Sequence, residues 1–143
     1  MPDIPEPFNN IPNPLPFSIG TKVKKEYFTG GQIRSKFIMS DNTGQNGLLK
    51  RYGYDGKITS TIPIQNGVMH GIETLFDTNG RILRKTPYVK GKKEGTMTIY
   101  YPNGSRMVEI NYLHNIRHGK AIKYNKDGSI NQEVIFQNGN IVE

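Results

Sequence analysis

The sequence predicts an all-β fold, an elongated array of about five stacked antiparallel β-hairpins that follows an irregular Pro-rich N-terminal arm. The main observation is a 24-residue period in the positions of glycine and aromatic residues. Asn-Gly or Asp-Gly lies inside each period, and apolar and polar residues alternate after it, as on a half-buried strand. Only 34% of the 143 residues are hydrophobic, so a large globular core is not expected, whereas the 10% aromatic content argues against disorder.

The predicted arm covers residues 1–17. It contains six prolines: Pro2, Pro5, Pro7, Pro12, Pro14 and Pro16. Proline fixes φ and lacks a backbone N–H, so neither a helix nor a central strand is expected there. Apolar residues lie between the prolines: Phe8, Ile11, Leu15 and Phe17. These residues either pack on the first hairpin as a cap or bind a partner as a peptide, and simple disorder is the third interpretation.

The start of the chain also bears on the compartment. Residues 1–16 carry Asp3 and Glu6 and no Lys or Arg, so they lack the basic start and apolar core of a secretory signal peptide. No apolar run approaches the ~18 residues needed to cross a bilayer. The chain has no Cys, which excludes disulfides and Cys-ligated metals. We therefore expect a cytoplasmic protein.

Five columns of residues spaced 24 apart define the repeat. Three are glycine columns: Gly47, Gly71, Gly95 and Gly119; Gly56, Gly80, Gly104 and Gly128; and Gly67, Gly91, Asn115 and Gly139. Two are mainly aromatic: Tyr52, Phe76, Tyr100 and Tyr124; and Ile64, Tyr88, Tyr112 and Phe136. A Tyr or Phe at each step buries roughly 150–250 Å², which compensates for the low apolar content.

A degenerate unit precedes these four. Tyr27 and Gly31 precede Tyr52 and Gly56 by one position more than the repeat period, and one extra residue within 42–46 accounts for the difference. Terminal units of repeat arrays are commonly atypical. The predicted organisation is an arm at 1–17 and one repeat domain at 18–143, with units of about 18–41, 42–66, 67–90, 91–114 and 115–138 and a short tail.

Each unit is predicted to form a hairpin. The turn dipeptides are Asp55-Gly56, Asn79-Gly80, Asn103-Gly104 and Asp127-Gly128. They favour a hairpin because glycine tolerates the positive φ that the turn requires. In the strand that follows, Val108, Ile110 and Tyr112 point one way, and the residues between them point the other way. The link from Gly91 to Gly95 has glycine at both ends, which permits a tight reversal into the next unit.

The unit G-x-x-x-G-x-x-x-x-[Y/F]-x-x-[N/D]-G-x-[I/L], which closes with [Y/F]-x-x-G, resembles the MORN repeat. The bacterial variant found in YwqK-like antitoxins is the form that the chain resembles most. The matching residues are Gly67 through Gly71, Phe76, Asn79-Gly80 and Tyr88, then Gly91 through Gly95, Tyr100, Asn103-Gly104 and Tyr112. The likeness covers about four-fifths of the chain, and three positions depart from it: Asn115, Arg106 and Ile64. It implies a non-catalytic binding or scaffolding module, and in bacteria an antitoxin or immunity protein.

An enzyme, a cofactor and a metal site are not expected. The serines lack a nucleophile-elbow context, and the recurring G-x-x-x-G lacks the Gly-Lys-Ser/Thr of a phosphate loop. Glu109 and Glu133 share one column and are interpreted as solvated charges on the sheet rather than an acid–base pair. The histidines are His70, His114 and His118, for which packing or hydrogen bonding is expected rather than metal binding.

The basic residues suggest the type of partner. With 19 Lys and Arg against 12 Asp and Glu, the net charge is +7, which favours an acidic partner or serves solubility alone. Arg84, Lys85, Lys92 and Lys93 belong to the densest basic segment, although the hairpin layout divides this segment between two rims. Lys92 and Lys93 are expected to lie along one rim with Arg117 and Lys120. The alternative interpretation is that these lysines form a solvated loop edge and bind no partner.

The predicted function is specific protein binding, in its sharpest form the neutralisation of a bacterial toxin with an acidic surface. The predicted partner-binding residues are Tyr54, Arg84, Lys85, Lys92, Lys93 and Tyr101, since Tyr and Arg dominate binding hot spots. The alternative is a membrane-associated scaffold that binds anionic lipid through its basic residues. Nucleic acid is a less favoured partner because few aromatic residues lie between the cations. An open array also leaves its end strands unpaired, which makes self-association a further option.

Overall fold

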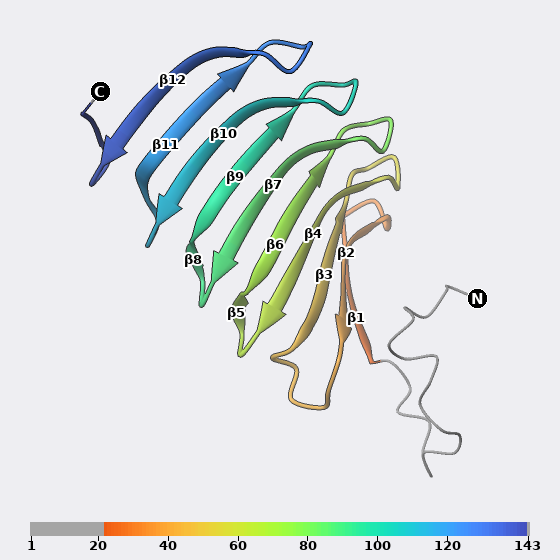
Figure 1. Ribbon diagram of the computed structural model, residues 1–143. Helices are drawn as coiled ribbons and strands as arrows, with labels where there is room; N and C mark the ends of the chain where they lie inside the picture. The colour runs from red at the N-terminus through yellow and green to blue at the C-terminus, as the bar shows by residue number, and fades with distance from the viewer. Residues whose placement is uncertain (1–21, 143) are drawn as a thin grey trace, which may run out of the picture.

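A computed structural model describes residues 22–142, which form one antiparallel sheet of thirteen strands without a helix (Figure 1). The ten longer strands are β1 (Val23–Tyr27), β2 (Ile33–Met39), β3 (Gly47–Tyr52), β4 (Ile58–Gln65), β6 (Gly71–Phe76), β7 (Ile82–Val89), β9 (Gly95–Tyr100), β10 (Arg106–Leu113), β11 (Ile116–Tyr124) and β12 (Ile130–Gln137). Three two-residue strands lie at one rim: β5 (Val68–Met69), β8 (Lys92–Lys93) and β13 (Asn140–Ile141).

The longer strands pair in sequence order, which gives five consecutive hairpins from β1–β2 to β11–β12. The predicted all-β array of stacked hairpins is therefore confirmed. The predicted Pro-rich arm and the start of the first unit fall on residues 1–21, outside the described part of the chain.

One rim of the sheet carries the five turns that close the hairpins, and we call it the turn rim. Its loops are residues 28–32, 53–57, 77–81, 101–105 and 125–129. In each loop the first residue donates to the carbonyl of the fifth, as Asp77 does to Arg81 over 2.8 Å. The fourth residue is a glycine at positive φ, 78° for Gly80, as the Asn-Gly and Asp-Gly dipeptides predict.

The opposite rim joins consecutive hairpins, and we call it the link rim: residues 40–46, 65–70, 89–94, 113–118 and 137–141. Its last four reversals each have two successive residues at positive φ, such as Lys90 (50°) and Gly91 (84°), which is the geometry of a type I′ turn. Each of these reversals also bonds to the preceding one. The bond from Gly91 N to the Met69 carbonyl is 2.8 Å, and that from Asn115 N to the Lys93 carbonyl is 3.0 Å.

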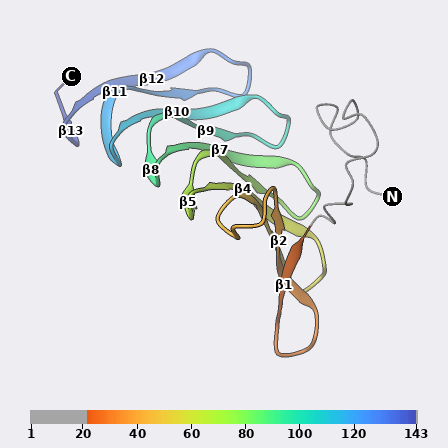
Figure 2. The ribbon, with the colours of Figure 1, turned by 90° about the horizontal axis from the view of Figure 1, so that it is seen from below.

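The two faces of the sheet differ in composition. Residues directly opposite each other in an antiparallel pair share a face, so the register assigns every strand residue to one side. The apolar face carries the most buried side chains, among them Ile62 (2% exposed), Thr86 (1%) and Met97 (6%). No second layer covers it within residues 22–142, so these side chains are buried by neighbours on the same bowed surface (Figure 2). The polar face carries the row that runs through Thr61, Thr74, Lys85 and Thr98.

The two aromatic columns lie on opposite faces rather than in one spine. Tyr112 is directly opposite Gly95, and this pairing places it on the apolar face. Tyr100 lies five residues after Gly95 in the same strand, so alternation places it on the polar face. Each column contains one fully buried ring, Phe136 on the apolar face and Tyr124 on the polar face, and its other aromatic members are half-buried.

Candidate binding surfaces

The six residues predicted to bind a partner are spread over the molecule and do not form one patch. Tyr54 and Tyr101 lie on the turn rim, and Lys92 and Lys93 lie on the link rim. Arg84 and Lys85 are neighbours in the middle of β7, so their side chains emerge on the apolar and the polar face respectively. A single flat partner therefore cannot contact all six at once.

The two turn-rim tyrosines have different surroundings. The Tyr54 side chain is 73% exposed and stacks one ring face on Phe28, with ring centroids 4.1 Å apart. Tyr101 is half-buried, and its hydroxyl donates to the Tyr124 carbonyl over 2.7 Å. Lys126 Nζ lies 5.9 Å from the Tyr101 ring centroid. Tyr54 thus presents an open ring to solvent, whereas Tyr101 joins two successive turns.

The link-rim cations pack on aromatic rings of the apolar face. Lys93 Nζ lies 5.1 Å from the Tyr112 ring centroid, and the Arg117 guanidinium lies 5.5 Å from that of Phe136. Lys93 also donates its backbone N–H to Asn115 Oδ1 over 2.7 Å. These two cations, which lie one repeat apart in the sequence, therefore have the same structural role in successive hairpins. Lys92 is exposed.

A polar cluster lies in the middle of the apolar face, and we call it the central cluster: Glu73, Arg84, Thr86 and Tyr88, from β6 and β7. Arg84 Nη2 lies 3.4 Å from Glu73 Oε1. Arg84 Nε and Thr86 Oγ1 are buried and have no hydrogen-bond partner among the residues that the structure describes. Burial, and secondarily the charge of Glu73, raises the pKa of the Tyr88 hydroxyl. The cluster therefore combines two unsatisfied buried atoms with an arginine side chain that is partly exposed and can reach a partner.

Of this cluster, only Arg84 was predicted from the sequence to bind a partner. Glu73 and Thr86 pair directly across β6 and β7 although they are distant in the chain, and Arg84 lies opposite Leu75. The repeat period marks equivalent positions in different hairpins and does not indicate which residues meet within one hairpin. The signal that finds them is the hairpin register counted outward from the Asn79-Gly80 turn.

Two of the three histidines, His70 and His114, connect successive links of the link rim. His70 Nδ1 accepts the Lys90 backbone N–H over 3.1 Å. His114 Nδ1 lies 3.2 Å from Glu94 Oε2, and His118 Nδ1 is buried and unpaired within residues 22–142. Across the described strands and loops, no three His, Asp or Glu side chains are grouped so that they could hold a metal ion.

The carboxylates on the polar face are engaged with basic or hydroxyl partners. Glu109 accepts a hydrogen bond from the Tyr124 hydroxyl and pairs with Arg106 over 2.7 Å. The bond to Glu109 raises the pKa of Tyr124, because the carboxylate favours the protonated hydroxyl. Glu133 pairs with Lys120 over 3.2 Å. This arrangement gives charge balance on the sheet surface and no free acid–base pair.

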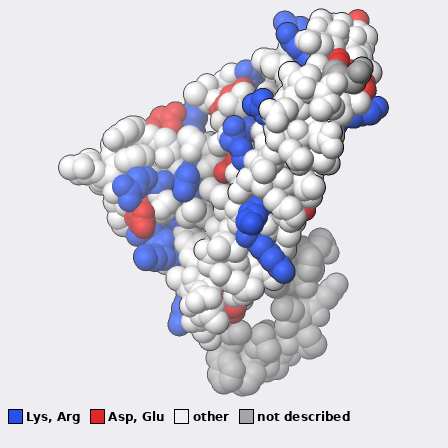
Figure 3. Space-filling view, turned by 90° about the vertical axis from the view of Figure 1, so that its left-hand side faces the viewer, with Lys and Arg blue, Asp and Glu red and all other residues white. Residues whose placement is uncertain are grey.

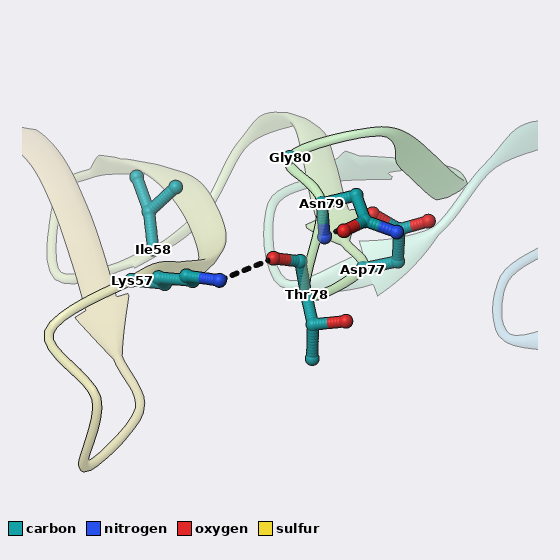
Figure 4. Close-up of a pocket in the computed structure, with 6 residues that line it drawn as sticks. All are labelled: Lys57, Ile58, Asp77, Thr78, Asn79 and Gly80. Carbon is teal, nitrogen blue, oxygen red and sulfur yellow. Dashed lines mark hydrogen bonds between the residues drawn. The ribbon is translucent and has the colours of Figure 1, made fainter.

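A shallow depression lies on the turn rim between two successive turns, lined by Lys57, Ile58, Asp77, Thr78, Asn79 and Gly80 (Figure 4). Lys57 Nζ spans it and donates to the Thr78 carbonyl over 3.0 Å. The Asp77 carboxylate accepts the backbone N–H groups of Asn79 and Arg81 and pairs with the Arg81 guanidinium. Its polar groups are therefore occupied by the turn itself.

Basic side chains are distributed over the surface rather than gathered in one patch. Figure 3 shows several separate groups of Lys and Arg with Asp and Glu between them. Four of the arginines pair with a carboxylate: Arg34, Arg81, Arg84 and Arg106. The described residues include no helix that could span a membrane.

The comparisons with known proteins agree with this geometry. The family described as MORN repeat variant matches the chain three times, at residues 69–90, 93–114 and 117–138. Each match starts within the link rim and ends in the next link, so it spans one hairpin (Figure 1). A search of curated proteins finds no match. Repeats of this family are generally non-catalytic modules that bind proteins or membranes.

Proposed function

Because the MORN repeat variant matches three successive hairpins, we propose that this chain is a non-catalytic protein-binding module whose apolar face docks on an acidic protein. In its sharpest form the proposal is an antitoxin or immunity protein, active in the cytoplasm, which neutralises a bacterial toxin by covering it. The central cluster is the observation that supports this proposal most directly. Its partly exposed arginine lies on a face that no second layer covers within residues 22–142.

The chemistry of the central cluster favours a carboxylate as its ligand. The Arg84 side chain is 39% exposed, while its Nε is buried without a partner among the described residues. Because Nε is buried, a partner carboxylate would bind at the terminal nitrogens of the guanidinium, where a charge-assisted hydrogen bond is strong. Glu73 occupies only one terminal nitrogen, at the long distance of 3.4 Å. A carboxylate of the partner can therefore accept the hydrogen bonds of Arg84 that Glu73 does not accept.

The surroundings of the central cluster suit a protein interface. Tyr88 is half-buried beside Arg84, and Ile99 lies directly opposite Arg84 in β9. Aromatic residues and arginine within an apolar surround are typical of hot spots, where desolvation strengthens the polar contacts. A standard interface of ~800 Å² per partner would cover less than a tenth of the 9989 Å² surface. One open face of this sheet is therefore large enough.

The finer assignment to toxin neutralisation rests on two further observations. The repeat pattern resembles that of bacterial YwqK-like antitoxins. The excess of basic over acidic residues fits an acidic target, so binding should weaken as salt rises. Such a module acts by occlusion, since an extended ridged sheet covers the partner's substrate groove without chemistry of its own.

The test is copurification with the tagged chain in its native cells, followed by a growth assay. The captured protein, expressed alone, should arrest growth, and coexpression of this chain should restore it. The variant Arg84→Ala should lose capture and rescue, whereas Lys57→Ala on the turn rim should keep both, with circular dichroism confirming that both variants fold. Rescue by Arg84→Ala at wild-type level contradicts the role of the central cluster. Salt-sensitive binding to phosphatidylserine vesicles without any protein partner would favour the membrane scaffold instead.

A further inference from the structure

The two ends of the sheet can pair with each other in the register that the array already uses. Within residues 22–142, β1 pairs only with β2, and β12 pairs with β11 and, over its last two residues, with β13 (Figure 1). Val108 and Glu109 of β10 pair with β11, and Gln132 and Glu133 hold the equivalent positions of β12, one repeat later. The outer edge of β12 therefore offers the positions at which another first strand would pair.

One row of paired residues crosses the whole polar face and changes charge along its length. From β1 to β12 it consists of Lys25, Lys36, Lys50, Thr61, Thr74, Lys85, Thr98, Glu109, Ile122 and Glu133. Three lysines begin the row, and glutamate ends it. The neighbouring row on the same face ends in two exposed apolar residues, Val23 (42% exposed) and Ile135 (38% exposed). Opposite charges thus mark the two ends of the first row, whereas the Ile135 carbonyl already accepts the Val142 backbone N–H of its own copy.

We propose that the chain binds a second copy of itself head to tail, with β1 of one copy antiparallel to β12 of the other. Lys25 and Ile122 hold equivalent positions in the first and the last hairpin. Lys25 of β1 is opposite Lys36 of β2, and Ile122 of β11 is opposite Glu133 of β12. Ile122 is also paired with Glu109 of the preceding hairpin. By the same register, Lys25 lies opposite Glu133 of the neighbouring copy, and Glu26 lies opposite Gln132, as Lys123 lies opposite Val108.

The charges favour this pairing over contacts between like ends. Two β1 edges would bring Lys24 and Lys25 against the same lysines, and two β12 edges would bring Glu133 toward Glu133, both of which are destabilising. Within one copy Glu133 uses Oε1 for Lys120, and a carboxylate can accept from several donors at once. A head-to-tail contact between two copies leaves one edge strand of each copy unpaired. Further copies can therefore add as the protein concentration rises, which yields chains or rings.

Charge reversal tests the pairing in the full-length protein. Wild-type association, followed by sedimentation velocity, should rise with concentration and fall with added salt. Lys25→Glu and Glu133→Lys should each weaken it by about tenfold or more, because like charges then face each other. A mixture of the two variants should associate again, since each contact between one variant and the other pairs a lysine with a glutamate. The control Lys123→Glu, exposed on the apolar face of β11, should behave as the wild type.

Cysteine crosslinking tests the register directly. The chain has no Cys, so the only thiols are those introduced in Glu26→Cys and Gln132→Cys, which keep Lys25 and Glu133 in place. Under mild oxidation, differently tagged single variants should form the mixed disulfide dimer in preference to either homodimer. A wild type that stays monomeric at its highest soluble concentration and low salt overturns the proposal. So does a charge-variant mixture that fails to associate, or crosslinking that gives only homodimers.

Discussion

The turn rim and the link rim are built from the same kinds of residue, but their backbone N–H groups bond to different parts of the chain. On the turn rim, Asp77 N donates to the Arg81 carbonyl in the same loop, so the bond closes one turn. On the link rim, Lys90 N donates to His70 Nδ1, and Asn115 N donates to the Lys93 carbonyl, so the bonds join successive hairpins. The turn rim therefore forms each hairpin, whereas the link rim keeps the hairpins in order. Substitutions on the link rim should therefore lower the free energy of unfolding more than substitutions on the turn rim.

The largest difference between the two rims is expected from a matched pair of glycine substitutions. A Cβ at Gly47, where the chain leaves the link rim, would lie 2.1 Å from the Ile38 carbonyl oxygen. A Cβ at Gly56 on the turn rim would meet nothing within 4 Å, and only its φ of 78° opposes a side chain. We expect Gly47→Ala to lower the free energy of unfolding by roughly 3 kcal/mol or more and Gly56→Ala by about 1–2 kcal/mol. Urea unfolding measures both, and equal losses would contradict the comparison.

A second prediction concerns the asparagine that replaces glycine on the link rim. Asn115 has a φ of 70°, and its Oδ1 accepts the Lys93 backbone N–H over 2.7 Å. Asn115→Ala should cost about 1–2 kcal/mol, because it keeps the unfavourable φ and loses the hydrogen bond. In Asn115→Gly the relief of backbone strain offsets the lost bond, so the change should stay within about 0.5 kcal/mol. Thermal unfolding of the two variants side by side tests this order, and an Asn115→Gly loss as large as that of Asn115→Ala would show that the bond alone matters.

Most of the fold follows from local sequence signals, which is why the turn rim was predictable. Asn-Gly and Asp-Gly set each turn by their own backbone preferences, and alternation after the turn sets the faces of the second strand. The side of the sheet on which each aromatic column lies was not predicted. It depends on the number of residues between Gly95 and Tyr100 and on the register shifts beside each turn, such as that between Arg106 and Val108.

The binding surface was harder to predict because its residues meet only through strand pairing. Arg84 was predicted from charge and residue type, but Glu73 and Thr86 carry no local pattern that links them to it. The link rim shows the same limit, since the partner of His70 is the backbone N–H of Lys90 in the next link. The contacts of the predicted basic residues within the chain were not predicted either: Lys93 packs on an aromatic ring, and Arg84 pairs with a carboxylate.

The third prediction sharpens the comparison by removing a connection between hairpins on the turn rim. The Tyr101 hydroxyl donates to the Tyr124 carbonyl over 2.7 Å, a side-chain bond that joins two successive loops. Tyr101→Phe keeps the ring and removes this bond, so a loss of about 0.5–1.5 kcal/mol is expected. Tyr54→Phe is the matched control, because its ring is largely exposed and no hydrogen bond of its hydroxyl is found among the described residues. Chemical denaturation of the pair measures the difference, and equal stability would mean that this side-chain bond contributes nothing.

The smallest effect is expected from a single charge within one turn. Asp127 Oδ1 accepts the Ser129 hydroxyl and backbone N–H over 2.6 and 2.9 Å, and the bond from the hydroxyl is the main cause that lowers the pKa of Asp127 below its ordinary value. A lowered pKa stabilises the fold above the unfolded-state value of 3.8, and this contribution disappears as pH falls through the folded-state pKa. Asn103 makes the same bonds to Ser105 without a charge, so Asp127→Asn should keep the turn and lose only this pH dependence. The stability difference between wild type and variant should therefore be constant at neutral pH and change only below about pH 4, as unfolding curves along a pH series would show. A difference that varied between pH 6 and 8 would assign the effect to another group.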